Sequence, residues 1–271
     1  MVLKKGILAL ESGKVFVGRS FGAEGERDGE IVFNTSLTGY QEILTDPSYC
    51  GQIVCMTNPH IGNYGVNAED MESAVPAVSG FITREASSIV SNWRANNSLH
   101  EFLAKHNIIA LEGIDTRALT KHIRDAGAMR AILTTANISP KKAVEKAKAS
   151  PGLVGRDLVK EVGCKEKYVF TGSKKQTASY KVAVLDCGCK ANILNELSLR
   201  GCEVHVFPAT VSADEILGLN PDGIMLSNGP GDPAAVTYVI NTVKKIIAEI
   251  EGGRTNASLF GICLGHQMLG L

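Results

Sequence analysis

The chain has 271 residues, and Lys plus Arg and Asp plus Glu each total 28, so its formal net charge is zero. This balance argues against nucleic acid or an anionic membrane as a main partner, because both select for clustered positive charge. The only apolar stretch at the N-terminus is the five-residue GILAL, whereas a secretory signal needs roughly 7–15 apolar residues and a membrane span about 20. We therefore expect a cytoplasmic protein, long enough for two domains.

Short strand-like runs separated by loops rich in Gly, Asn, Pro and Asp fill the first part of the chain. These runs are GILALESG, KVFVGRS, EIVFNTS, GQIVCMTN and VSGFITRE. Helical spacing follows in residues 99–107, 116–127 and 139–150. Strands followed by helices are typical of an α+β domain. Residues 1–150 are therefore predicted to form a small N-terminal domain with a mixed sheet.

Residues 151–180 are predicted to connect this domain to a second one. The segment ends in the polar stretch TGSKKQTASY, which has no hydrophobic periodicity. Stretches rich in Gly, Ser and Lys between periodic segments are typical of linkers. We place the linker itself at residues 171–180.

Strands and helices alternate regularly in residues 181–271. Apolar runs rich in Val, Ile and Leu predict strands at 181–188, 202–208, 222–228 and 258–262. Helices are predicted between them, at 191–201, at 212–220 with Ser212 as the N-cap, and at 234–253. This alternation indicates an α/β domain with a parallel sheet covered on both faces. Ligands of such sheets bind beyond the carboxyl ends of the strands.

A cysteine lies at one of these strand ends, in the sequence G-I-C-L-G (261–265). In a nucleophile elbow the glycines remove side chains that would clash in a tight strand-to-helix turn. The helix that follows favours the thiolate of Cys263, and the N–H of Leu264 can face an oxyanion. The alternative is an inert cysteine buried between strand and helix, and the five-residue pattern alone leaves both interpretations open.

A second glycine-rich loop, S-N-G-P-G-D-P (227–233), follows the predicted strand at 222–228. It is not a nucleotide-binding P-loop, because no G-K-[ST] follows. Alone it is consistent with an ordinary Gly-Pro turn. Two glycine-rich strand ends of one parallel sheet can flank a single crevice, however, and glycine N–H groups facing an activated cysteine make an oxyanion hole for acyl transfer.

The remaining cysteines are predicted to be free thiols rather than a disulfide framework or a metal site. The chain has seven cysteines, an odd number, without a recognisable disulfide spacing. Cys187, Cys189, Cys202 and His205 suggest zinc as an alternative, but C-x-C lacks the paired spacing of zinc sites. We expect no metal site.

Taken together, LSNGPGDP and FGICLGHQ resemble the class I, triad-type glutamine amidotransferase domain. Three stretches of the first half, GEIVFNTSLTGYQEILTDPSYCGQIV, PHIGNYG and GIDTRALT, resemble the small subunits of carbamoyl phosphate synthetase. This resemblance extends over nearly the whole chain. It implies a small β/β/α domain in residues 1–150, followed in residues 181–271 by an incomplete flavodoxin-like amidotransferase domain.

The resemblance also implies an activity and a partner. Members of the family hydrolyse L-glutamine through a cysteine thioester and pass the ammonia to a large subunit, which uses ATP and Mg to make carbamoyl phosphate for pyrimidine and arginine biosynthesis. The expected assembly is a cytoplasmic heterodimer, a ligase, with no cofactor in this chain. By position in the motifs, Cys263 matches the nucleophile. The residues matched to glutamine binding are Ser48, Gly229, Gly231, Leu264 and Gln267.

The family's catalytic base is a histidine that, with its carboxylate partner, lies well downstream of the elbow. None of the six histidines here matches it. We therefore expect a chain truncated after the elbow and inactive by itself. Two alternatives remain, namely a non-catalytic short form that acts as a binding subunit for the large chain, and another cysteine-elbow hydrolase.

Overall fold

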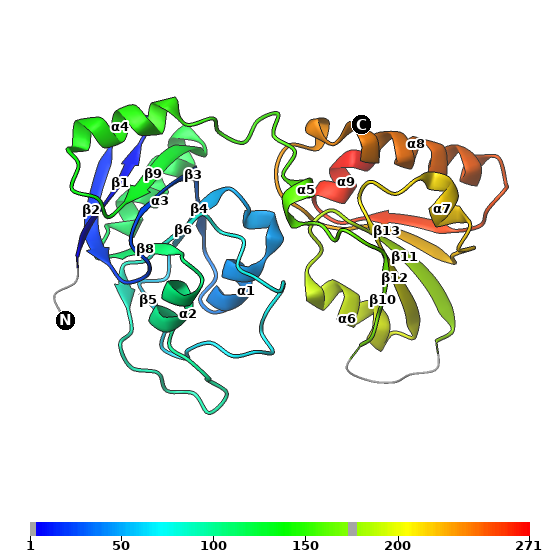
Figure 1. Cartoon of the computed structure of the whole chain (residues 1–271), viewed down its shortest axis with the longest axis horizontal. Helices are drawn as coiled ribbons and strands as arrows, with labels where there is room; N and C mark the ends of the chain where they lie inside the picture. The colour runs from blue at the N-terminus through cyan, green and yellow to red at the C-terminus, as the bar shows by residue number, and fades with distance from the viewer. Residues whose placement is uncertain (1–3, 173–177) are drawn as a thin grey trace. The chain divides into compact units, whose positions relative to one another are not determined.

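The computed structural model describes residues 4–172 and 178–271. It divides the chain into two compact units, Met1–Leu153 and Val154–Leu271 (Figure 1). Each unit buries apolar side chains in clusters of its own. The expected mixed α/β architecture, with an N-terminal domain followed by a second domain that contains a parallel sheet, is confirmed.

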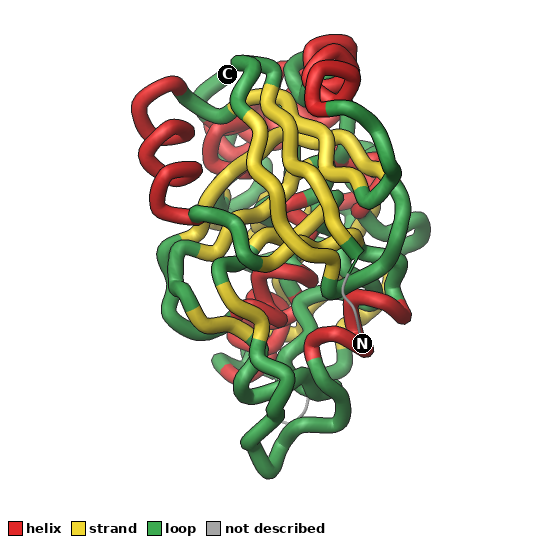
Figure 2. The backbone as a smooth tube through the Cα atoms, turned by 90° about the vertical axis from the view of Figure 1, so that its left-hand side faces the viewer, coloured by secondary structure: helices red, strands yellow, loops and turns green. Residues whose placement is uncertain are grey.

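The sheet of the first unit closes into a barrel with strand order β1-β2-β8-β6-β4-β3-β9. Its strands are among those drawn in yellow in Figure 2. Strands β3, β4, β6 and β8 run parallel to their neighbours within that group, and the other pairs are antiparallel. The sheet is therefore mixed, as predicted, but its closure was not foreseen. The strands are β1 Lys5–Leu10, β2 Val15–Ser20, β3 Glu26–Asn34, β4 Gln52–Met56, β6 Gly80–Ile82, β8 Ile109–Glu112 and β9 Met129–Thr134.

In the described residues of this unit, four helices accompany the barrel, and the three that the sequence predicted are present. Leu119 and Ile123 of α3 join the same buried cluster as Leu8 and Ile31 of the barrel strands. Strands β8 and β9 and helix α1 were not predicted, because short apolar runs beside helices do not reveal their structure by periodicity. The helices are α1 Tyr40–Thr45, α2 Leu99–Lys105, α3 Thr116–Ala126 and α4 Pro140–Ala149; the smaller elements are η1 Pro47–Tyr49, β5 His60–Ile61 and β7 Glu85–Ala86.

The second unit contains the predicted parallel sheet, with strand order β10-β12-β11-β13-β14. Only the edge strand β10 is antiparallel to its neighbour among these described strands. The strands are β10 Tyr168–Phe170, β11 Tyr180–Asp186, β12 Cys202–Pro208, β13 Gly223–Leu226 and β14 Ser258–Gly261. The helices are α5 Val159–Val162, α6 Ala191–Leu199, α7 Ala213–Leu217, α8 Thr237–Glu251 and α9 Leu264–Leu269, with the 3₁₀ turn η2 at Pro233–Ala235.

Helices cover both faces of this sheet, as predicted. Successive residues of β11 point to opposite faces, so Ala183 and Leu185 enter one buried cluster while Val182 and Val184 enter the other. Within this unit, α6 lies on one face and α7, α8 and α9 lie on the other (Figure 1). Among the described residues no helix is long and apolar enough to cross a membrane.

Part of the expected connecting segment, residues 151–180, is structured and belongs to the second unit. Strand β10 pairs with β12, and Val159 of α5 is buried in the same cluster as Leu185. The predicted linker at 171–180 contains residues 173–177, which lie outside the described residues.

An ion pair in the first unit connects the end of β1 to β9. The Glu11 carboxylate accepts hydrogen bonds from the Arg130 backbone N–H at 2.7 Å and from its Nε at 2.8 Å. Arg130 also donates to the Ser150 carbonyl, just after α4, at 2.9 Å. The side-chain hydrogen bond from Arg130 is the largest of the effects that lower the pKa of Glu11. Glu11 and Arg130 together therefore connect the ends of two barrel strands to the residue that follows α4.

We predict that Glu11→Gln lowers the unfolding free energy by about 1 kcal/mol at pH 7, because the pair is only partly buried. The folded pKa of Glu11 is lowered, so its stabilisation is complete above the unfolded pKa of about 4.3 and is lost as the pH falls through the folded pKa. The difference between wild type and variant should therefore shrink below about pH 4.3 in urea unfolding.

Glu24→Gln is the matched control, because Glu24 forms an exposed pair with Lys4 at 2.8 Å. Such pairs contribute about 0–1 kcal/mol. A Glu11→Gln effect of the same size at pH 7 and at pH 3 would contradict the role assigned to the charged carboxylate.

Candidate active site

Cys263 occupies a strained turn between β14 and α9. Its backbone lies at φ 51° and ψ −112°, a conformation that costs a residue with a side chain on the order of 1–3 kcal/mol and that clusters at functional sites. The Ile262 N–H donates to the Leu226 carbonyl at 3.0 Å, and the Gln267 N–H donates to the Cys263 carbonyl at 2.9 Å. Cys263 is also the one exposed residue among the seven free cysteines. The alternative of a buried packing cysteine is therefore wrong.

The two glycines of the elbow lie where no side chain fits. A Cβ on Gly261 would lie 2.6 Å from the carbonyl carbon of Gly265. A Cβ on Gly265 would lie 2.4 Å from the carbonyl oxygen of Leu226, the last residue of β13. Real Cβ atoms do not approach backbone this closely, so the turn can form only with glycine at both positions.

The second glycine-rich loop lies beside the elbow, because β13 and β14 are paired neighbours with Leu226 opposite Gly261. A Cβ on Gly229 would lie 2.2 Å from the Cys187 carbonyl oxygen and 2.9 Å from Cδ2 of Leu264. The Leu264 side chain therefore packs directly against the Gly229 backbone. The tertiary structure thus brings Gly229 and Leu264 together, and their role as an oxyanion hole stays a prediction.

Backbone N–H groups at this junction are available for a ligand. Within residues 4–172 and 178–271, no atom accepts a hydrogen bond from the N–H of Gly229 or of Leu264, although both residues are buried. Buried backbone N–H groups almost always have a partner. Two N–H groups without an acceptor are the kind of donor from which an oxyanion hole is built.

Ser227 connects the three strand ends that form the site, and sequence reasoning gave it no role. It is fully buried. Its hydroxyl accepts a hydrogen bond from the Cys187 N–H at 2.9 Å and donates to the Asn228 carbonyl at 2.8 Å. Its own carbonyl accepts from the Gly265 N–H at 3.2 Å. The available signal was a polar residue at the end of an apolar strand.

The segment before α5 bonds to the outer part of the glycine-rich loop. The Asp232 carboxylate accepts hydrogen bonds from the Ala234 N–H at 2.9 Å and from the Gly155 N–H at 3.2 Å. Gly231 lies beside this segment at φ 85°, and a Cβ there would lie 3.3 Å from the carbonyl oxygen of Arg156. The two glycines of the loop differ in exposure, because Gly231 lies at the surface whereas Gly229 is buried.

The other two predicted glutamine-binding residues lie in different units. Gln267 is exposed on α9, one turn after Cys263. Ser48 is half-buried in η1 of the first unit, where its N–H donates to the Asp46 carboxylate at 2.9 Å. The contact of each residue with glutamine stays a prediction.

A base for Cys263 is not found among the described histidines. His205, on β12, bonds to Glu203 at 2.6 Å, and His266 is exposed on α9. Within residues 4–172 and 178–271, no side chain forms a hydrogen bond with the Cys263 thiol. The elbow is therefore assembled here without a bonded general base.

The arrangement of the other cysteines does not resemble a zinc site. Cys187 is buried on one face of the sheet, whereas Cys189 and Cys202 pack on the other. No group of three or more His, Cys, Asp or Glu side chains in the described part of the chain is arranged to hold a metal ion.

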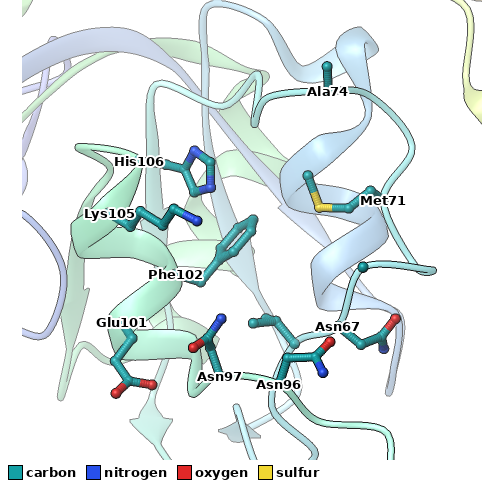
Figure 3. Close-up of a pocket in the computed structure, with 11 residues that line it drawn as sticks. Asn67, Met71, Ala74, Asn96, Asn97, Glu101, Phe102, Lys105 and His106 are labelled. Atoms are coloured by element: carbon teal, nitrogen blue, oxygen red, sulfur yellow. The ribbon is translucent and has the colours of Figure 1, made fainter.

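A separate hollow of about 590 Å³ lies in the first unit, between the loop carrying Asn67 and Met71 and helix α2. Figure 3 shows Phe102 of α2 at its centre, with His106 on one side and Asn97 on the other. Its lining residues include no cysteine or serine. Cys263 and the N–H groups of Gly229 and Leu264 are in the other unit, so this hollow is not the candidate active site.

Comparison with known proteins agrees with both halves of the structure. The family model described as "Carbamoyl-phosphate synthase small chain, CPSase domain" matches residues 8–133, and "Glutamine amidotransferase class-I" matches residues 183–271. A carbamoyl phosphate synthase small chain from Syntrophotalea carbinolica is 51% identical over 98% of this chain and 72% of its own length. The chain belongs to the carbamoyl phosphate synthase small chain family.

Further relatives in this family have the same name and similar coverage. The small chain from Akkermansia muciniphila is 49% identical over 98% of this chain and 71% of its own length. The one from Thermotoga maritima is 50% identical over 99% of this chain and 66% of its own length. Among solved structures, an aminopeptidase from Aneurinibacillus sp. strain AM-1 aligns with 11% identity and a TM-score of 0.30, over 82% of this chain and 56% of that one, which is too weak to indicate a shared fold.

We predict that Cys263 is the first thiol alkylated by iodoacetamide at neutral pH. It is exposed, whereas burial raises the pKa of Cys55, Cys164 and Cys187 to about 12. A pKa of that size leaves about a thousandth or less of the thiolate of an ordinary cysteine. Peptide mapping after brief labelling would measure the order, and earlier labelling of Cys187 or Cys202 would contradict it.

Proposed function

We propose that Cys263 is the nucleophile of a glutaminase and that the Gly229 and Leu264 N–H groups form its oxyanion hole. The observation that carries this proposal is the exposed cysteine at positive φ, together with two buried residues, Gly229 and Leu264, whose N–H groups have no acceptor among the described residues. Backbone strain and N–H donors without an acceptor both cost folding stability, and features of this kind cluster at functional sites.

The proposed reaction begins when the Cys263 thiolate attacks the side-chain amide carbon of L-glutamine. The carbonyl π electrons move to oxygen, and the resulting oxyanion accepts hydrogen bonds from the two N–H groups. The C–N bond then breaks, and the nitrogen takes a proton and leaves as ammonia. Water attacks the thioester, which releases glutamate and restores the thiol. Ser48, Gly231 and Gln267 are proposed to hold the substrate.

The ammonia is proposed to pass to a large synthetase chain, the heterodimer partner that the family resemblance implies. That chain would use ATP, Mg and bicarbonate to form carbamoyl phosphate for pyrimidine and arginine biosynthesis, in the cytoplasm. The names of the relatives support the first part of this proposal, because each is a small chain of carbamoyl phosphate synthase.

We further propose that residues 1–271 by themselves do not turn over glutamine. Ammonia release requires an acid, and thioester hydrolysis requires a base to activate water. No described side chain is bonded to the Cys263 thiol, and His205 and His266 are engaged or exposed elsewhere. The lack of a base bonded to Cys263 among the described residues also supports the second candidate function, in which this polypeptide is a non-catalytic binding subunit for the large chain.

The test of the nucleophile uses a chimera in which residues 1–271 are joined to the segment that follows the elbow in the Syntrophotalea carbinolica relative. With a large synthetase chain present, Cys263→Ser should abolish glutamine-dependent carbamoyl phosphate synthesis and leave ammonia-dependent synthesis intact, because only the former uses the thiol. Cys202→Ser, at a half-buried cysteine outside the site, is the control. Loss of both activities in Cys263→Ser would mean that Cys263 is structural.

Glutamate release from residues 1–271, with and without the large chain, should be slower than from the chimera by about 10²–10⁴-fold, the usual contribution of a positioned acid–base group. Mass spectrometry should at most detect slow, stoichiometric glutamyl acylation of Cys263. Turnover within about tenfold of the chimera would show that these residues already contain a working base.

A further inference from the structure

Ser227 lies immediately before the proposed oxyanion hole, and its polar atoms are all engaged. Its N–H donates to the Leu185 carbonyl of β11 at 3.1 Å, and its carbonyl accepts from Gly265 at 3.2 Å. Its hydroxyl accepts from Cys187 at 2.9 Å and donates to the carbonyl of Asn228 at 2.8 Å. With no exposed surface, the hydroxyl has a fixed orientation.

The acceptor of this hydroxyl belongs to a peptide group that matters for the chemistry. The Asn228 carbonyl and the Gly229 N–H are the two ends of one peptide bond, which is planar and trans. A hydrogen bond that holds the carbonyl end therefore also sets the direction of the N–H end. It also polarises the peptide, which makes the N–H a stronger donor.

Other contacts flank this peptide, and Ser227 bonds directly to its carbonyl end. The Asn228 side-chain oxygen accepts from the Lys190 N–H at 3.1 Å, and Gly229 lies against the Cys187 carbonyl and Leu264. Gly229 has no side chain of its own to fix its backbone angles. The hydroxyl of Ser227 donates a hydrogen bond to the carbonyl end of the peptide.

We propose that Ser227 is a positioning residue that aims the Gly229 N–H at the oxyanion. The inference rests on the proposed function and adds a residue that neither the motifs nor the family resemblance assigned. Ser227 touches no reacting atom in this proposal and acts through the Asn228–Gly229 peptide. Its removal should therefore slow attack on a carbonyl, where an oxyanion forms, more than attack on carbon, where none forms.

The experiment compares two reactions of the same thiol in the wild-type chain and in Ser227→Ala. Acylation is followed by p-nitrophenolate release from the γ-p-nitrophenyl ester of glutamate, whose leaving group needs no acid. Alkylation is followed with iodoacetamide, which reacts without an oxyanion. Because loss of an oxyanion donor costs about 10²–10³-fold and misalignment costs less, acylation should slow by about tenfold or more while alkylation changes by less than about twofold.

Two further variants separate positioning from stability. Ser227→Thr retains the hydroxyl and should recover most of the acylation rate. Ser212→Ala removes the hydroxyl that caps α7 through the Glu215 N–H at 3.2 Å, which destabilises the same unit by about 0.5–2 kcal/mol without touching the site. It should leave the ratio of the two rates unchanged.

Equal slowing of acylation and alkylation in Ser227→Ala would overturn the proposal, because Ser227 would then only maintain the elbow. Unchanged acylation would overturn it as well. Cys263→Ala is the control for the proposed function, which fails if that variant releases p-nitrophenolate as fast as wild type. In that case the positioning role of Ser227 is tested by comparing crystal structures of the wild type and Ser227→Ala. Rotation of the Asn228–Gly229 peptide in the variant supports the role, and an unchanged peptide contradicts it.

Discussion

The second unit depends on the close approach of α9 to the ends of β13 and β14. These strands are paired with Leu226 opposite Gly261, so the chain leaving β14 must turn directly above the Leu226 carbonyl. A Cβ at Gly265 would lie 2.4 Å from that oxygen, and therefore only glycine permits the turn. Because the turn is so tight, Cys263 takes a positive φ of 51°, and its thiol is presented to solvent instead of to the core.

The strand ends around this turn are stabilised by buried polar side chains that bond to the backbone of the loops. Asp186, at the end of β11, accepts hydrogen bonds from the N–H groups of Gly188 and Cys189 at 2.8 and 2.7 Å and from Cys164 at 2.9 Å. Ser227, at the end of β13, does the same for Cys187. Satisfying the loop backbone in this way leaves few N–H groups unbonded, so the free donors at Gly229 and Leu264 stand out as sites for a ligand.

The first unit is a closed barrel that contains one of the predicted site residues, Ser48. Its barrel has no free sheet edge, and its cores fill with apolar side chains from strands and helices. Its one predicted site residue, Ser48, already uses its N–H in a local turn with Asp46. The proposed nucleophile and oxyanion hole both lie at the strand ends of the second unit, and the family relationship is what adds the glutamine contact of Ser48 and a large-chain partner as proposals.

The sequence by itself determined the alternation of strands and helices in residues 181–271 and the elbow around Cys263, because both depend on local hydrophobic period and on where glycine must stand. Closure of the barrel, the contact of Gly229 with Leu264 and the role of Ser227 were decided only by the tertiary structure. Each depends on which strands become neighbours. Ser227 and Gly265 are 38 positions apart in the chain, counted from their residue numbers, and no local pattern encodes that the carbonyl of one meets the N–H of the other. Only the pairing of β13 with β14 brings them together.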